Sequence, residues 1–105
     1  MTIISFTSCK TDCEMLAQVD KNSECLIIVE ELLNSEITKL NAKGRNLNDG
    51  YECVCKEDNR WWYLYRNQIE RGDTIIKKKG ELTFKIHKKD TILTYNWECD
   101  GKVYE

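Results

Sequence analysis

The sequence predicts an α+β protein in which an N-terminal helix or helix pair packs on an antiparallel β-meander of five or six strands. Between residues 12 and 44, apolar residues recur three and four positions apart, which is the spacing of a helix. From residue 51 onward, apolar and polar residues alternate with a period of two, which is the pattern of strands. A length of 105 residues predicts a single domain covering residues 1–105.

A first helix is expected from about residue 12 to residue 19. Thr11-Asp-Cys-Glu14 has the pattern of a capping box, in which the Thr11 hydroxyl and the Glu14 carboxylate satisfy backbone N–H groups. This helix would place Met15, Leu16 and Val19 on one side.

A second helix is expected to begin after Asn22 or Ser23 and to end near Gly44, a residue that suits the left-handed C-cap. Its apolar stripe would consist of Leu26, Val29, Leu33, Ile37 and Leu40. A buried strand over Cys25–Glu30 is the alternative, because short apolar runs fit both structures. The helix is preferred because the periodicity continues to Leu40.

The expected strands are residues 51–56, 61–65, 74–79, 82–87, 91–99 and the return through residues 103–104. Asp100-Gly101 is a strong signal for a two-residue hairpin before the last of them. The order of helices followed by an antiparallel sheet resembles the layout of cystatin-like folds. The Gln-x-Val-x-Gly hairpin of cystatins does not occur in this sequence, so their activity is not implied.

Composition limits the classes of protein. Charged residues make up 32% of the chain and apolar residues 41%, which fits a folded soluble protein. The net charge of −2 argues against an acidic nucleic-acid mimic and against a strongly basic nucleic-acid binder. The longest apolar run, Cys25–Val29, is too short to cross a membrane. The first residues lack the pattern of a signal peptide, which favours the cytoplasm.

Six cysteines, an even number, occur in this short chain: Cys9, Cys13, Cys25, Cys53, Cys55 and Cys99. Free thiols in a reducing compartment are preferred, because the aliphatic content is sufficient for a core without cross-links. Disulfides would instead indicate secretion; the pairs considered join Cys9 or Cys13 to Cys53 or Cys55, and Cys25 to Cys99. A four-thiolate zinc site is disfavoured because Cys-x-Cys within a strand separates the two sulfurs. No metal or other cofactor is predicted.

The segment Trp61-Trp-Tyr-Leu-Tyr65 carries the best candidate binding site. In a strand, Trp61 and Trp62 point to opposite faces and cannot enter one core. One face of the sheet therefore carries an exposed tryptophan, and exposed aromatic residues mark interaction sites. Since Trp, Tyr and Arg dominate binding hot spots, the expected contact residues are Trp61, Trp62, Tyr63 and Tyr65, with Arg60, Arg66 and Arg71 around them.

Catalysis is not predicted, because the one histidine, His87, has no evident nucleophile partner and no catalytic motif is present. Two other binding modes have some support. A basic sheet face of Lys77, Lys79, Lys85, His87 and Lys89 beside the tryptophans would suit single-stranded nucleic acid. Arg71-Gly72-Asp73 spells the tripeptide of integrin ligands, although Gly and Asp are also ordinary turn residues.

Together, these patterns predict a small non-catalytic module that binds a protein partner and acts as an inhibitor or antagonist, of the viral, phage or toxin-immunity kind. The first alternative is a secreted, disulfide-bonded, host-modulating ligand with an exposed loop at residues 71–73. The second is a single-stranded nucleic-acid-binding protein.

Overall fold

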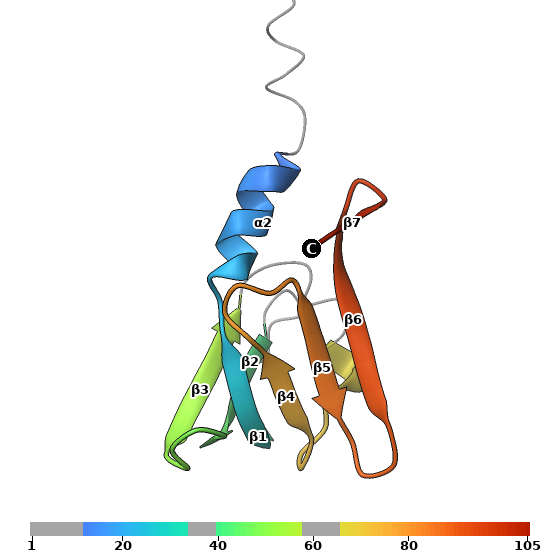
Figure 1. Cartoon of the computed structure of the whole chain (residues 1–105). Helices are drawn as coiled ribbons and strands as arrows, with labels where there is room; N and C mark the ends of the chain where they lie inside the picture. The colour runs from blue at the N-terminus through green and yellow to red at the C-terminus, as the bar shows by residue number, and fades with distance from the viewer. Residues whose placement is uncertain (1–11, 34–39, 58–65) are drawn as a thin grey trace, which may run out of the picture.

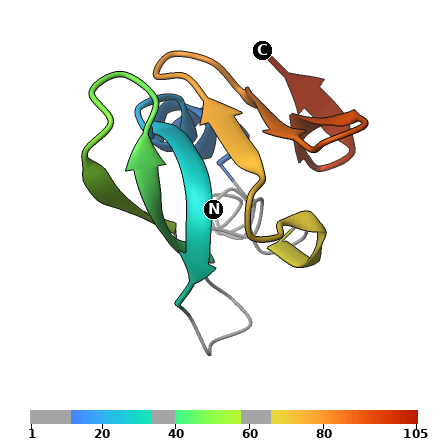
Figure 2. The same ribbon diagram turned by 90° about the horizontal axis from the view of Figure 1, so that it is seen from below.

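The structure is a computed structural model that describes residues 12–33, 40–57 and 66–105. Its elements are α2 (Cys13–Lys21), β1 (Cys25–Leu32), β2 (Leu40–Asn46), β3 (Glu52–Glu57), the 3₁₀-helix η1 (Arg66–Gln68), β4 (Thr74–Lys77), β5 (Thr83–His87), β6 (Ile92–Cys99) and β7 (Lys102–Tyr104). The strands form an antiparallel sheet in the order β3-β2-β1-β4-β5-β6-β7, which confirms the α+β class. Helix α2 stands at one end of the strands (Figure 1), and a view along them shows how the sheet curves (Figure 2).

The predicted second helix is wrong. Residues 25–32 and 40–46 form β1 and β2, so the described residues hold seven strands where five or six were expected. Along β1, Cys25, Ile27 and Val29 are buried, whereas Ile28 is exposed. This period-two burial fits the strand alternative, and a run of β-branched residues packs well on a pleated surface.

The order of the strands also differs from a simple meander. β4 follows β3 in the chain, yet it pairs with β1 through Ile27 and Ile75. From β4 to β7, neighbours in sequence are neighbours in the sheet, as predicted. The predicted hairpin at Asp100-Gly101 is confirmed: both residues have positive φ, as a tight turn between twisted strands requires.

The core lies on the concave face of the sheet. Its buried members are contributed by every strand from β1 to β6, with one residue from the helix and one from each of the loops before β4 and β5. They include Ala17, Ile27, Val29, Ala42, Ile69, Ile75, Phe84, Ile86 and Trp97. Aromatic contacts extend this core toward the β6–β7 hairpin, where the rings of Trp97 and Tyr104 pack edge to face with their centroids 5.2 Å apart.

The first helix is confirmed, but its orientation is unexpected. Asp12 caps it, because its Oδ1 accepts a hydrogen bond from the Met15 N–H at 3.0 Å. The predicted cap, Thr11, lies outside the described residues. Met15, Leu16 and Val19 share a side, as predicted, but that side faces solvent and Met15 is 62% exposed. The buried side carries Cys13, Ala17 and Asp20.

At Gly44, the backbone of β2 leaves no room for a side chain beside β1. A Cβ atom built on Gly44 would lie 1.9 Å from the backbone oxygen of Ile28. Glycine is therefore required here for close approach within the sheet, and not for a helix C-cap as the sequence suggested.

Replacing Gly44 with alanine is expected to lower the free energy of unfolding by about 1–3 kcal/mol, because a backbone atom blocks the new methyl group and the two strands must separate. Urea denaturation measures the change. Gly50→Ala is a useful comparison, because its Cβ meets nothing within 4 Å and only its positive φ is strained. Equal losses in the two variants would show that the close approach at Gly44 does not constrain the sheet.

Candidate functional site

Most of the predicted contact residues lie outside the described residues; these are Arg60, Trp61, Trp62, Tyr63 and Tyr65. Arg66 is the first residue of η1, and Arg71 is exposed in the turn before β4. The aromatic contact site therefore remains a prediction from the sequence.

The Arg71-Gly72-Asp73 tripeptide does not form an exposed recognition loop. Asp73 is buried; its Oδ2 accepts hydrogen bonds from the Glu70 N–H at 2.8 Å and from Lys88 Nζ at 2.5 Å. Lys88 also pairs with Glu70 at 3.0 Å. The Asp73 carboxylate, which an integrin ligand would have to expose, is therefore hydrogen-bonded within the protein. Burial lowers the pKa of Lys88, but its hydrogen bonds to the two carboxylates outweigh that effect and the pKa is raised.

Four of the five cysteines that the structure describes form disulfides, which corrects the expectation of free thiols. Cys13 at the start of α2 is joined to Cys99 at the end of β6, and Cys25 in β1 is joined to Cys55 in β3. Neither pair is one of those considered from the sequence. The reason is topological: β1 lies inside the sheet, with Cys25 turned to the same concave face as Cys55.

Cys53 has a free, half-buried thiol, and Cys9 lies outside the described residues. Among the residues that the structure describes, the side chains that come together at metal-binding distances are those of Cys13, Cys99 and Asp100. The two sulfurs of that group are already bonded to each other.

Lys77 is buried, which corrects its predicted place on a basic outer face. Its side chain is 0% exposed, and its Nζ donates to the backbone oxygens of Lys21 at 3.2 Å and Ser23 at 2.8 Å. These carbonyls lie at or just beyond the C-terminal end of α2, where the helix dipole attracts a cation. Lys77 therefore ties β4 to the helix end and is not available to a nucleic acid.

Asp20 completes this buried polar cluster. Its Oδ2 accepts a hydrogen bond from Trp97 Nε1 at 2.5 Å. Burial raises the pKa of Asp20 above 3.8, although the Trp97 hydrogen bond and the charge of Lys77 oppose the shift. The cluster of Asp20, Lys77 and Trp97 joins the helix, β4 and β6.

The raised pKa of Asp20 predicts a pH dependence of stability. The folded protein binds the proton of the Asp20 carboxyl group more tightly than the unfolded chain does. The contribution of Asp20 to the free energy of unfolding is therefore largest below pH 3.8, and it falls as the pH rises through the raised pKa. The free energy of unfolding of the wild type minus that of Asp20→Asn should therefore decrease across this window and level off above it. Urea denaturation at a series of pH values measures the difference. A difference that grows with pH would show that the fold favours the carboxylate.

A groove of about 630 Å³ crosses the outer face of β4 and β5. Its lining comprises Ile76, Lys78, Gly80, Glu81, Leu82, Thr83, Lys85, His87, Asn96 and Glu105. The alternation that buries Phe84 and Ile86 turns Lys85 and His87 outward, as the sequence predicted for these two residues. Lys79 and Lys89 are exposed but do not line the groove, so the predicted basic face is reduced to its β5 members and Lys78.

An apolar shelf, formed by Leu26, Ile28 and Ile76, adjoins the groove. Leu26 is the Cα partner of Ile76, and Ile76 is the partner of Lys85. Ile28 follows Leu26 on the same face and is 43% exposed. The outer face therefore changes from aliphatic on β1 to basic on β5.

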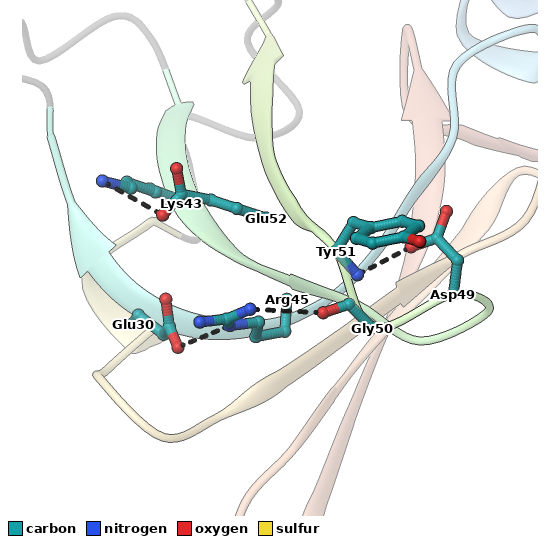
Figure 3. Close-up of polar contacts among 7 residues, drawn as sticks. All are labelled: Glu30, Lys43, Arg45, Asp49, Gly50, Tyr51 and Glu52. Carbon is teal, nitrogen blue, oxygen red and sulfur yellow. Dashed lines mark hydrogen bonds and ion pairs between the residues drawn. The ribbon is translucent and has the colours of Figure 1, made fainter.

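Beyond the shelf, two ion pairs lie on the outer face of β1, β2 and β3 (Figure 3). Lys43 Nζ lies 3.3 Å from Glu52, and Arg45 Nε lies 3.3 Å from Glu30. Arg45 also donates to the backbone oxygen of Gly50 at 3.4 Å. Exposed pairs of this kind contribute little stability, but they neutralise the charge of this part of the surface.

No protein-family model, curated protein or solved structure matches this chain. Within the described ranges, no helix is long and apolar enough to cross a membrane.

Sequence reasoning missed the buried cluster and the groove for different reasons. The only signal for the cluster was that Lys77 stands two positions after Ile75, which places both on one face of a strand. That signal required knowing that Ile75, and not Ile76, faces the core. The groove depends on the curvature of the sheet, which no local pattern specifies.

Proposed function

We propose that this chain is a small, disulfide-linked, non-catalytic module that works outside the cytoplasm by binding a protein partner and antagonising it. The observation that supports this proposal best is the pair of disulfides, Cys13–Cys99 and Cys25–Cys55, which span 86 and 30 residues of sequence. Long-range disulfides persist in oxidising compartments and are rare in the cytoplasm. The expectation of a cytoplasmic protein rested on free thiols and on the absence of a signal-peptide pattern in the first residues.

Exposed apolar residues on the outer face support the binding part of the proposal. Ile28 on β1, Val54 on β3 and Ile92 on β6 are each at least 43% exposed, and Tyr51 before β3 is 74% exposed. Exposed apolar area interspersed with charge is the usual makeup of a transient protein interface. The segment at residues 61–65 adds aromatic contact residues to this proposal, with Trp61 and Trp62 as its anchors.

Two measurements test the proposal. Alkylation without reductant, followed by intact mass, is expected to leave four cysteines protected in the native protein, and peptide mapping should recover the two disulfides. The oxidised protein is then screened against an array of secreted proteins and cell-surface ectodomains. We expect binding to at least one, loss of that binding after reduction, and inhibition of the partner's activity.

The aromatic residues are tested in the same assay. Trp61→Ala/Trp62→Ala should weaken the binding, whereas a surface change such as Lys56→Glu should not. Alkylation of all six thiols in the native protein, or an array without any bound ectodomain, would refute the proposal.

A further inference from the structure

The groove lies over β4 and β5, which are both inner strands of the sheet, and this limits how the groove can bind a ligand. β4 has β1 and β5 as neighbours, and β5 has β4 and β6. Their backbone N–H and C=O groups are therefore used in the sheet. A ligand in the groove cannot add a strand and has to be recognised by side chains.

Among the described residues, the lysines of the groove take part in no ion pair, unlike three of the other cations. Within residues 12–33, 40–57 and 66–105, Lys43, Arg45 and Lys88 are engaged in ion pairs, whereas Lys78 and Lys85 are in none. An ammonium group offers three hydrogen-bond donors and no acceptor. The lining also contains the carboxylates of Glu81 and Glu105, so the groove as a whole has no excess of positive charge, but its two ammonium groups are open to a ligand.

Charge is distributed unevenly along the groove. Glu81 and Lys78 stand in the β4–β5 connection, whereas Lys85 and His87 lie further along β5. Glu105 also lines the groove. At roughly 3.3 Å per residue, the distance from Glu81 to His87 is about 20 Å, the length of an extended segment of about six residues. The end away from the turn suits an acidic group.

The apolar shelf of Leu26, Ile28 and Ile76 distinguishes among anionic ligands. A sulfated glycan or a nucleic-acid backbone would use the lysines but would leave these aliphatic side chains exposed. A protein segment with an acidic residue next to an aliphatic or aromatic one would use both features, because the partner of Ile76 in the sheet is Lys85.

We propose that the groove binds an extended, acidic segment of the partner protein, with a carboxylate of that segment on Lys85 and His87 and a neighbouring apolar side chain on Ile76. This inference rests on the proposed function, because it assigns the surface and the chemistry of the partner.

The experiment selects binders from a library of random extended peptides displayed on phage, using the oxidised protein as bait. We expect the selected peptides to be enriched in Asp or Glu adjacent to an apolar residue. A synthetic peptide from the selection should shift the backbone amide signals of Ile76, Thr83, Lys85 and His87 in NMR titrations. Heparin and a single-stranded oligonucleotide serve as competing anionic probes.

Three charge variants make the test specific to the groove. Lys85→Glu should weaken binding of the acidic peptide by about tenfold or more, since it replaces attraction by repulsion. Glu81→Lys should strengthen it, and Lys56→Glu, which makes the same charge change on β3, should leave it unchanged. A general loss of folding would weaken peptide binding in both variants, so it would not explain weaker binding by Lys85→Glu together with stronger binding by Glu81→Lys.

Selected peptides without acidic enrichment, equal effects of Lys85→Glu and Lys56→Glu, or binding of heparin or the oligonucleotide in preference to every peptide would each overturn the inference. Peptides that bind instead through Trp61 and Trp62 would overturn the groove assignment and leave the proposed function intact. An ectodomain array without any bound partner would count against the proposed function itself.

Discussion

Replacing Lys77 with methionine is expected to lower the free energy of unfolding by about 3–5 kcal/mol, the usual effect of removing one partner from a buried, hydrogen-bonded charge cluster. Methionine keeps most of the volume of the side chain, so the loss arises from polarity and not from a cavity. The backbone oxygens of Lys21 and Ser23 would lose their donor, and Asp20 would lose the positive charge that opposes its burial.

Chemical denaturation with the disulfides intact measures this change. Lys79→Met is the matched control, because Lys79 is exposed in the β4–β5 turn and should change stability by less than about 0.5 kcal/mol. The double variant Lys77→Met/Asp20→Asn should recover part of the loss, since it removes the uncompensated carboxylate. Equal stability of Lys77→Met and Lys79→Met would show that the buried cluster does not hold the helix end to the sheet.

Removing the Cys13–Cys99 disulfide as Cys13→Ala/Cys99→Ala is expected to cost about 4–5 kcal/mol in the chain-entropy model, because the cross-link closes a long loop. Its separation of 86 residues exceeds the 30 residues of Cys25–Cys55, for which the same model gives about 3.5 kcal/mol. The long cross-link also holds the start of α2 against the end of β6. Its loss should therefore allow the helix to separate from the sheet before the strands unfold.

Thermal unfolding followed by circular dichroism, together with hydrogen exchange, distinguishes these effects. Exchange should accelerate first at the amides of α2 in Cys13→Ala/Cys99→Ala, whereas in Cys25→Ala/Cys55→Ala it should accelerate in β1 and β3. An unchanged unfolding midpoint after reduction of the wild-type protein would contradict both expectations.

Several features of the fold follow from local sequence. The helix at residues 13–21 begins where a polar side chain can cap it, and Asp12 takes that role. The hairpin at Asp100-Gly101 needs two residues that tolerate positive φ, and the alternation of β5 places Lys85 and His87 outward without reference to other strands. The interactions that form the cap, the hairpin turn and the alternation involve only residues close together in the chain. For this reason the α+β class was predictable.

Tertiary structure decided the remaining features. The run Cys25–Val29 fits both a helix and a strand, and pairing with β2 and β4 selects the strand. Ile75 and Ile76 are chemically alike, yet the register with β1 and β5 buries Ile75 and with it Lys77. Six cysteines allow many pairings, and only the strand order determines which sulfurs meet. Each of these outcomes depends on contacts between residues far apart in sequence. Local sequence patterns carry no information about the free energy of such contacts.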